Sequence, residues 1–266
     1  FSTSKRQTIE YSKIIYDMFV RRELIKISEQ TIDTAKLNDL NTNGQNIIEN
    51  SERLLFDLAE KGSFNSSLIK FDEAMRQTIE MASAAYKNEE GIVGVPTGLR
   101  DLDDRLGGLH KSDLIIIAGR PGMGKTAFVL SMARDTAVQF KHPVAVFSLE
   151  MSSIQLVNRL IASETEIPSD KLRKGNLKPH EYEQLHARIG ALANAPIFID
   201  DTPALSIFEL RAKARRLKQQ HDIELIIIDY LQLMTAGSSK GGNREQEIST
   251  ISRSIKEIAK ELNIPI

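Results

Sequence analysis

The segment Gly119-Arg120-Pro121-Gly122-Met123-Gly124-Lys125-Thr126 directly follows an apolar run at residues 114–118. It has the form G-x-x-x-x-G-K-T, in which glycines permit a tight turn whose N–H groups face phosphate oxygens. Lys125 is suited to the β- and γ-phosphates and Thr126 to Mg²⁺, while the N-terminus of the following helix favours an anion. An ordinary glycine-rich turn is the alternative. The flanking strand and helix patterns favour a phosphate-binding loop for a nucleoside triphosphate.

From residue 92 onward, short apolar runs alternate with helical patterns. The apolar runs cover residues 114–118, 144–147, 197–199 and 225–228, and a fifth run begins near Ile264. The helical patterns cover residues 127–140, 154–163, 181–193, 207–219 and 245–262. The apolar runs do not alternate with polar residues, as expected for strands that are buried on both faces. We therefore expect an α/β domain with a doubly wound, mostly parallel sheet and ligands at the carboxyl ends of its strands.

Carboxylates follow three of these predicted strands. Asp229 ends the run at 225–228, where an Asp can orient Mg²⁺ beside a phosphate loop. Glu150 follows the run at 144–147 and could polarise the water that attacks the γ-phosphate, or could simply begin a helix. For Asp200 and Asp201, turn formation before Pro203 is the favoured interpretation.

The first 62 residues have helical spacing of apolar residues without strand patterns, which predicts the end of a helical domain built as an αα-hairpin. Residues 63–91 read as a linker that contains one amphipathic helix, with apolar residues Phe71, Met75, Ile79, Ala82 and Tyr86. This stripe could pack on its own domain or on another subunit. Residues 92–266 form the predicted ATPase-type domain.

Two segments are basic. The cations of the helix at 207–219 fit a solvated face. The loop at 237–244 contains Lys240, Asn243 and Arg244 and lies just beyond the Asp229 strand, so it is either a nucleic-acid contact or a plain loop. The five histidines have no metal-binding spacing.

The composition excludes several classes of protein. With 35 basic and 36 acidic residues, any nucleic-acid contact must be local. The absence of cysteine excludes disulfides and suits the cytoplasm. No apolar stretch approaches about 18 residues, so we expect no membrane span. Phe1 is not an initiator Met, and the terminal Ile264-Pro265-Ile266 reads as the start of a strand, so both ends suggest a fragment of a longer protein.

Several motifs resemble the bacterial replicative DNA helicases of the DnaB family, which are RecA-like ATPases. Besides the phosphate loop, these motifs are Gly94-Val95-Pro96-Thr97-Gly98, Asp101-Leu102-Asp103, Gly107-Gly108-Leu109, Phe147-Ser148-Leu149-Glu150-Met151 and Ile228-Asp229-Tyr230-Leu231-Gln232-Leu233-Met234. Their order and spacing match over residues 92–266, and the hairpin and linker helix match more loosely.

The resemblance implies a hexameric ring around single-stranded DNA, with ATP and Mg²⁺ at the subunit interfaces and a primase and a helicase loader as partners. It implies that Glu150 is the catalytic base, that Lys125, Thr126 and Asp229 hold phosphate and metal, and that Gln232 couples the site to the DNA side. The linker helix would dock on the adjacent subunit. The family's polar sensor, main DNA-binding loop and arginine finger would lie beyond Ile266, so the fragment could be poorly active.

Two other functions stay open from the sequence. One is a RecA-like strand-exchange or repair ATPase that forms filaments, against which the N-terminal hairpin and linker helix argue. The other is a helical scaffold that carries a nucleotide-gated remnant of an ATPase.

Overall fold

The computed structural model describes residues 5–37, 43–62, 70–87, 92–235 and 244–266. The chain divides into two compact units, Phe1–Ala74 and Met75–Ile266. The boundary between these units falls inside helix α3 (Phe71–Lys87). The domain limits expected from composition, at residues 62 and 91, therefore stay predictions.

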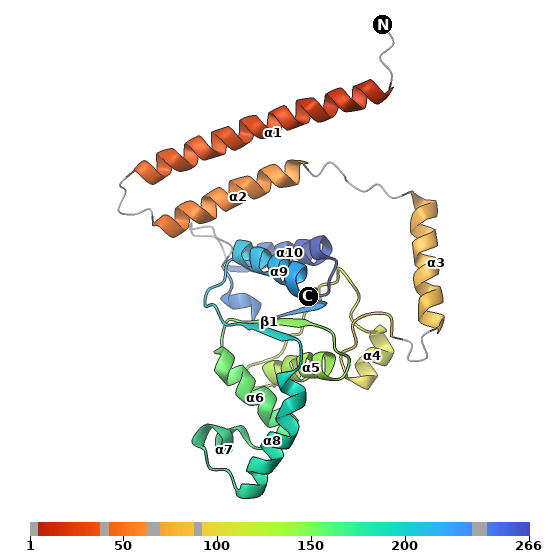
Figure 1. Ribbon diagram of the computed structural model, residues 1–266, viewed down its shortest axis with the longest axis vertical. Coiled ribbons are helices and arrows are strands. Elements are labelled where there is room, and N and C mark those ends of the chain that lie inside the picture. Colours follow the sequence, from red (N-terminus) through yellow and green to blue (C-terminus); the bar gives the residue numbers. More distant parts are fainter. Residues whose placement is uncertain (1–4, 38–42, 63–69, 88–91, 236–243) are drawn as a thin grey trace. The chain divides into compact units, whose positions relative to one another are not determined.

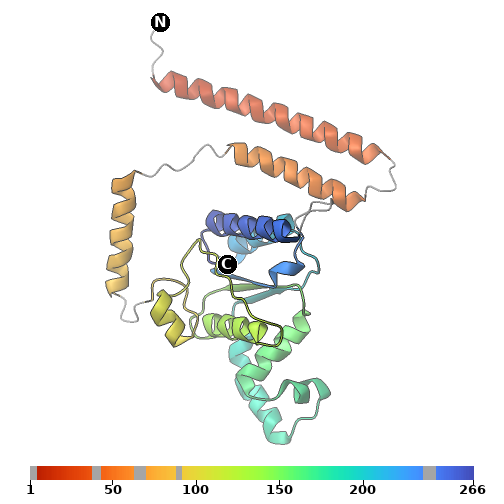
Figure 2. The ribbon, with the colours of Figure 1, turned by 180° about the vertical axis from the view of Figure 1, so that it is seen from behind.

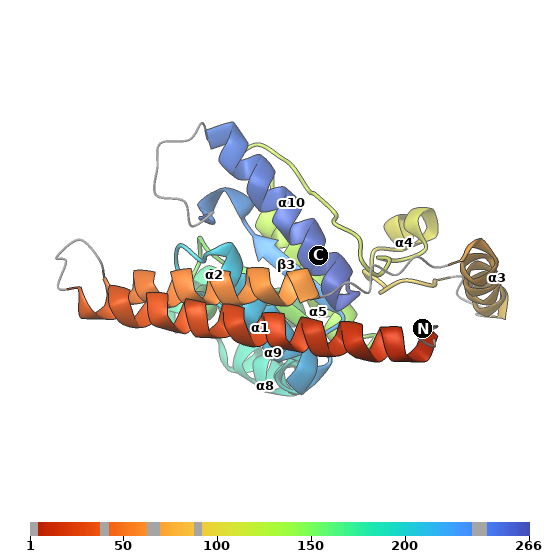
Figure 3. The same ribbon diagram turned by 90° about the horizontal axis from the view of Figure 1, so that it is seen from above.

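The first unit contains two long helices, α1 (Lys5–Lys36) and α2 (Gly44–Gly62), which lie side by side (Figure 3). Ile27 of α1 and Leu58 of α2 are buried, and the hydroxyls of Thr31 and Ser51 are 3.0 Å apart. Many other apolar side chains of α1, such as Ile15 at 70% exposure, remain accessible. The two helices bury little apolar surface between them, as expected for a pair without a third layer.

The second unit is built around three parallel strands, β1 (Val144–Ser148), β2 (Ile197–Asp200) and β3 (Leu225–Asp229). Their order is β2-β1-β3, and Val144 pairs with Ile197 on one side and Leu225 on the other. All five residues of β1 are buried. The predicted α/β class and parallel sheet are confirmed, and the continuous apolar runs reflect burial on both faces.

Helices cover both faces of this sheet (Figures 1 and 2). Ala145 and Phe147 of β1 join a core cluster with α9 (Ile207–His221) and α10 (Arg244–Leu262). Val144 and Val146 join the opposite cluster with α5 (Lys125–Val138) and α6 (Ser153–Thr165). Successive strand residues point to opposite faces, so one short strand anchors two hydrophobic cores.

The helices agree with the predicted ranges within a few residues, but two short ones were missed. These are α4 (Arg100–Leu106) and α7 (Ser169–Lys174); α8 (Pro179–Ala193) follows α7, and a short 3₁₀ turn, η1 (Leu231–Leu233), follows β3. Both missed helices have two turns or fewer, which is too short for an apolar periodicity to be visible in the sequence.

Residues 114–118 were predicted to be the first strand, but they do not form one in the structure. This segment has no regular secondary structure and does not belong to the three-stranded ladder. Its backbone bonds are with the last residue: Ile115 N donates to Ile266 O at 2.8 Å, and Ile266 N donates to Asp113 O at 2.9 Å. Ile226 N of β3 donates to Pro265 O at 3.1 Å. Residues 264–266 therefore lie between β3 and this segment and provide too few bonds for a ladder.

A buried carboxylate fixes the segment that leads into the phosphate loop. Asp103 of α4 is 5% exposed and accepts hydrogen bonds from Thr97 N, Thr97 Oγ1 and Gly98 N at 2.8–3.1 Å. Gly98 has a φ of +77°, and a Cβ there would lie 2.3 Å from Cβ of Asp135 on α5. The Gly94–Gly98 motif is therefore explained by packing.

We expect Asp103→Asn to destabilise the protein by about 2 kcal/mol, because the amide group replaces an acceptor that faces several donors. Urea unfolding followed by circular dichroism measures the loss. Asp104→Asn, on the exposed side of the same helix, should change stability by less than about 0.5 kcal/mol. Equal effects of the two changes would contradict the proposed role of Asp103.

Candidate nucleotide-binding site

The phosphate loop lies between residues 114–118 and α5 and has the backbone of an anion cradle. Gly122 and Gly124 have φ values of +79° and +85°, and a Cβ at either position would meet no atom within 4 Å. In the described part of the chain, the N–H groups of Gly122, Gly124 and Lys125 have no backbone acceptor. The first N–H groups of a helix lack intrahelical partners, so these donors are available for phosphate oxygens.

Lys125 and Thr126 occupy the positions that the motif predicts. Lys125 Nζ donates to the carbonyl oxygens of Gly119 at 2.9 Å and Arg120 at 3.4 Å, so the ammonium group lies over its own loop. Thr126 Oγ1 donates to Asp229 Oδ2 at 2.7 Å. A hydroxyl and a carboxylate at this distance are oxygen ligands of the kind Mg²⁺ prefers, and they fit an ion held beside triphosphate oxygens.

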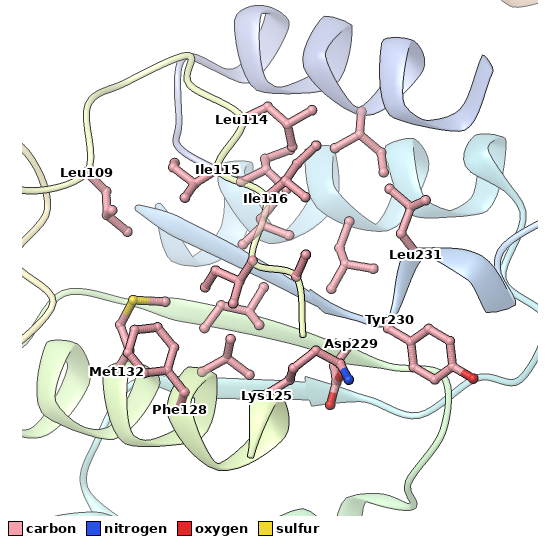
Figure 4. Close-up of a pocket in the computed structure, with 18 of the residues that line it drawn as sticks. Leu109, Leu114, Ile115, Ile116, Lys125, Phe128, Met132, Asp229, Tyr230 and Leu231 are labelled. Carbon is pink, nitrogen blue, oxygen red and sulfur yellow. The ribbon is translucent and has the colours of Figure 1, made fainter. Parts of the chain in front are cut away.

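A cavity of about 490 Å³ begins at this loop and follows the edge of β3 that does not pair with β1 (Figure 4). Most of its lining is apolar, from residues 114–118, α5 and β3. Lys125 and Asp229 lie at one end, and Tyr230 and Leu231 lie close to Asp229 (Figure 4). The peptide bond between Asp229 and Tyr230 is cis. Because Lys125 and Asp229 line its polar end, that end of the cavity coincides with the predicted phosphate site.

Glu150 lies in the turn between β1 and α6, one strand away from Asp229. Its residue is exposed, and its carboxylate makes no hydrogen bond or ion pair with other described residues. Leu149 N donates to Asp229 O at 2.8 Å, which ties this turn to the tip of β3. The structure therefore places Glu150, Thr126 and Asp229 at the same edge of the sheet, with the Glu150 carboxylate free to bind water.

Among the described residues, the remaining predicted site residues make no hydrogen bond to the phosphate loop. Gln232 belongs to η1 and is exposed. Arg244 donates to the Gln232 carbonyl and pairs with Glu247 at the start of α10. Lys240 and Asn243 lie outside the described residues, so their assignment as DNA contacts stays a prediction.

The cations of α9 are largely paired, but Arg211 is buried at 7% exposure and so does not belong to the solvated face that the sequence predicted. Arg211 and Arg215 pair with glutamates of α10, Lys218 pairs with Asp222, and Lys213 pairs with Asp200 at 2.7 Å. Burial opposes ionisation of Asp200, but hydrogen bonds from Lys213 and Thr202 outweigh burial and hold its pKa below the usual range. Thr202 N donates to Asp200 Oδ1 at 3.0 Å, which confirms the turn expected here.

Asp201 has a contact that the sequence did not reveal. Its Oδ2 accepts from Ser153 N at 2.7 Å, across 48 residues of sequence. The Ser153 hydrogen bonds hold the pKa of Asp201 below its usual range. A turn-forming Asp before a proline has an ordinary sequence pattern, and only the fold brings it to the start of α6.

In the described ranges, no group of three or more His, Asp or Glu residues could hold a metal ion without further ligands. Within those ranges, no helix is both long and apolar enough to cross a membrane.

Comparisons with known proteins agree with this geometry. Residues 94–266 match the family model of the DnaB-like helicase C terminal domain. The chain is 43% identical over 268 residues to the replicative DNA helicase DnaB of Rickettsia conorii, covering 97% of this chain and 54% of the relative. It is 36% identical over 256 residues to the replicative DNA helicase DnaC of Bacillus subtilis, covering 96% of this chain and 56% of that protein.

Two solved structures are also similar to this chain. A DnaB-like replicative helicase, described together with its interactions with primase, superposes with a TM-score of 0.74 at 27% identity, over 99% of this chain and 59% of that one. A structure described as an ATPase domain gives a TM-score of 0.68 at 32% identity, over 74% of this chain and 69% of its own. The chain spans about half the length of the curated relatives it matches. It belongs to the family of DnaB-like replicative helicases.

Proposed function

We propose that the protein is an ATP-dependent DNA helicase that uses ATP hydrolysis to translocate on single-stranded DNA and unwind duplex at the replication fork. The observation that carries this proposal is the arrangement of the phosphate loop, the Thr126–Asp229 pair and the unpaired Glu150 at one edge of the sheet. The family membership supports it, since the matched relatives are named replicative DNA helicases.

The residues would divide the chemistry between them. The N–H groups of Gly122, Gly124 and Lys125 in the loop and the Lys125 ammonium group would bind the triphosphate, which requires Lys125 to leave the carbonyls of its own loop. Thr126 and Asp229 would hold Mg²⁺, which neutralises phosphate charge when it is bound. Glu150 would orient a water molecule and accept its proton as the water oxygen bonds to the γ-phosphorus, while the bond from that phosphorus to the β–γ bridging oxygen breaks and ADP leaves. Gln232 would couple this site to the DNA side.

The partners belong to the same proposal. We infer a homo-hexamer that encircles single-stranded DNA and joins its subunits through the linker helix and the ATPase faces. The exposed apolar side chains of α3, with Phe71 at 83% and Tyr86 at 92%, support a docking role for that helix. A primase and a helicase loader are proposed as further partners, and a structure of a similar helicase is described with primase.

Glu150→Gln tests the catalytic assignment. We expect the rate of DNA-stimulated ATP hydrolysis to fall at least about 100-fold, because the amide cannot accept the proton of the attacking water. The affinity for a fluorescent ATP analogue should stay within about twofold of the wild type. Glu183→Gln, an exposed change on α8, serves as the control and should leave both quantities unchanged. Unaffected hydrolysis in Glu150→Gln would show that Glu150 is not the base.

Binding of single-stranded DNA should depend strongly on salt. The logarithm of the association constant should fall linearly with the logarithm of salt concentration, by about 0.7 for each phosphate contact. We expect Lys240→Ala to reduce this slope by about one contact, as measured by fluorescence anisotropy. Arg216→Ala, on the exposed face of α9, should leave the slope unchanged. Binding that does not depend on salt would argue against a ring that tracks the DNA backbone.

A further inference from the structure

The turn that carries Glu150 is tied to the fold at several points. Within the turn, Ser148 Oγ donates to Met151 O at 2.8 Å and accepts from Met151 N at 3.2 Å, while Ser148 itself is 1% exposed. The bond from Leu149 N to the Asp229 carbonyl fixes the strand side of the turn. These contacts hold the residues on both sides of Glu150, but they come only from β1 and β3.

The helix side of the turn is held from a different strand. Asp201 immediately follows β2, and its carboxylate accepts the N–H of Ser153, the first residue of α6. A carboxylate at a helix N-terminus makes a charge-assisted bond with an N–H that has no partner inside the helix. The lowered pKa of Asp201, caused first by the Ser153 N–H, agrees with a carboxylate that is ionised at neutral pH.

Helix formation alone does not require this bond. The start of α6 already has a local cap, because Ser152 N donates to Gln155 Oε1 at 3.2 Å. The Asp201 bond instead joins two segments that are 48 residues apart, and its effect is to fix where the helix begins relative to β2. Only two residues separate Ser153 from Glu150, so this bond limits how far the Glu150 backbone can move.

We propose that Asp201 is a positioning residue for Glu150. It holds the start of α6 at the tip of β2, so that the Glu150 carboxylate stays on the same edge of the sheet as Thr126 and Asp229. This inference rests on the proposed function, since it assumes that Glu150 is the base. A displacement of about 1 Å in a reacting group can reduce a rate up to about 100-fold, which makes such a restraint useful.

The test compares Asp201→Ala with Asp201→Asn in DNA-stimulated ATP hydrolysis. We expect Asp201→Ala to lower kcat about tenfold with little change in KM for ATP, since the phosphate loop is untouched. Asp201→Asn keeps an oxygen that can accept from Ser153 N and should recover most of the rate. Combined with Glu150→Gln, Asp201→Ala should cause no further loss, because the base that it positions is then absent.

Glu181→Ala is the matched control. Glu181 is also a carboxylate at a helix start, where it accepts from Lys178 N at 2.8 Å and pairs with Lys171 at 2.6 Å, but its bonds do not reach the residues of the Glu150 turn. Its loss should lower stability in a similar way but leave kcat unchanged. If Glu181→Ala and Asp201→Ala reduced kcat equally, the effect would be a general loss of structure and the inference would be overturned.

A second measurement does not depend on activity. Amide hydrogen exchange in residues 149–153 should be faster in Asp201→Ala than in the wild type, while exchange in β1 should stay the same. Unchanged exchange in this turn would overturn the inference. A wild-type protein that hydrolyses no ATP, or a Glu150→Gln variant that keeps full activity, would instead contradict the proposed function and leave the exchange result to decide the role of Asp201.

Discussion

The site depends on the hydrogen bond from Thr126 to Asp229, 2.7 Å long, which joins the start of α5 to the tip of β3. This one contact brings the phosphate loop next to a carboxylate that is more than 100 residues later in sequence, and both groups are oxygen ligands suited to Mg²⁺. Asp229 is 7% exposed, and a buried carboxylate is stable only when it is hydrogen-bonded or paired. The loop and the sheet are therefore linked through this pair of side chains, at the position proposed for Mg²⁺.

The cores on the two faces of the sheet hold this pair in place. Phe147 faces one core with α9 and α10, while Val146 faces the other with α5 and α6. Because interiors are closely packed, a strand that is buried on both sides cannot shift without disturbing both cores. The tips of β1 and β3 are consequently rigid supports for Glu150 and Asp229, and the bond from Leu149 N to the Asp229 carbonyl keeps them together. A catalytic arrangement needs such rigid elements behind it.

Much of the fold and the centre of the site were predictable from the sequence. Glycine at positions of positive φ and continuous apolar runs are direct consequences of backbone geometry and burial, so the glycine-rich turn before α5 and the strands β1, β2 and β3 were predicted within a residue. The start of α5 at Lys125, two residues before the predicted start, was missed because the end of the loop already has helical geometry. The segment at 114–118 was apolar enough to be a strand, but a strand also needs partners, and sequence patterns do not report pairing.

Contacts between residues that are far apart in the sequence could not be predicted from sequence patterns. The bond from Ser153 to Asp201 joins residues 48 apart in the sequence, and residues of these types are equally common in ordinary turns. A crystal structure with Mg²⁺ and a non-hydrolysable ATP analogue tests the central claim most directly. We predict that Lys125 Nζ leaves the Gly119 and Arg120 carbonyls for the phosphates, and that the metal lies beside Thr126 and Asp229. A nucleotide bound elsewhere, with Lys125 still on its own loop, would contradict the account.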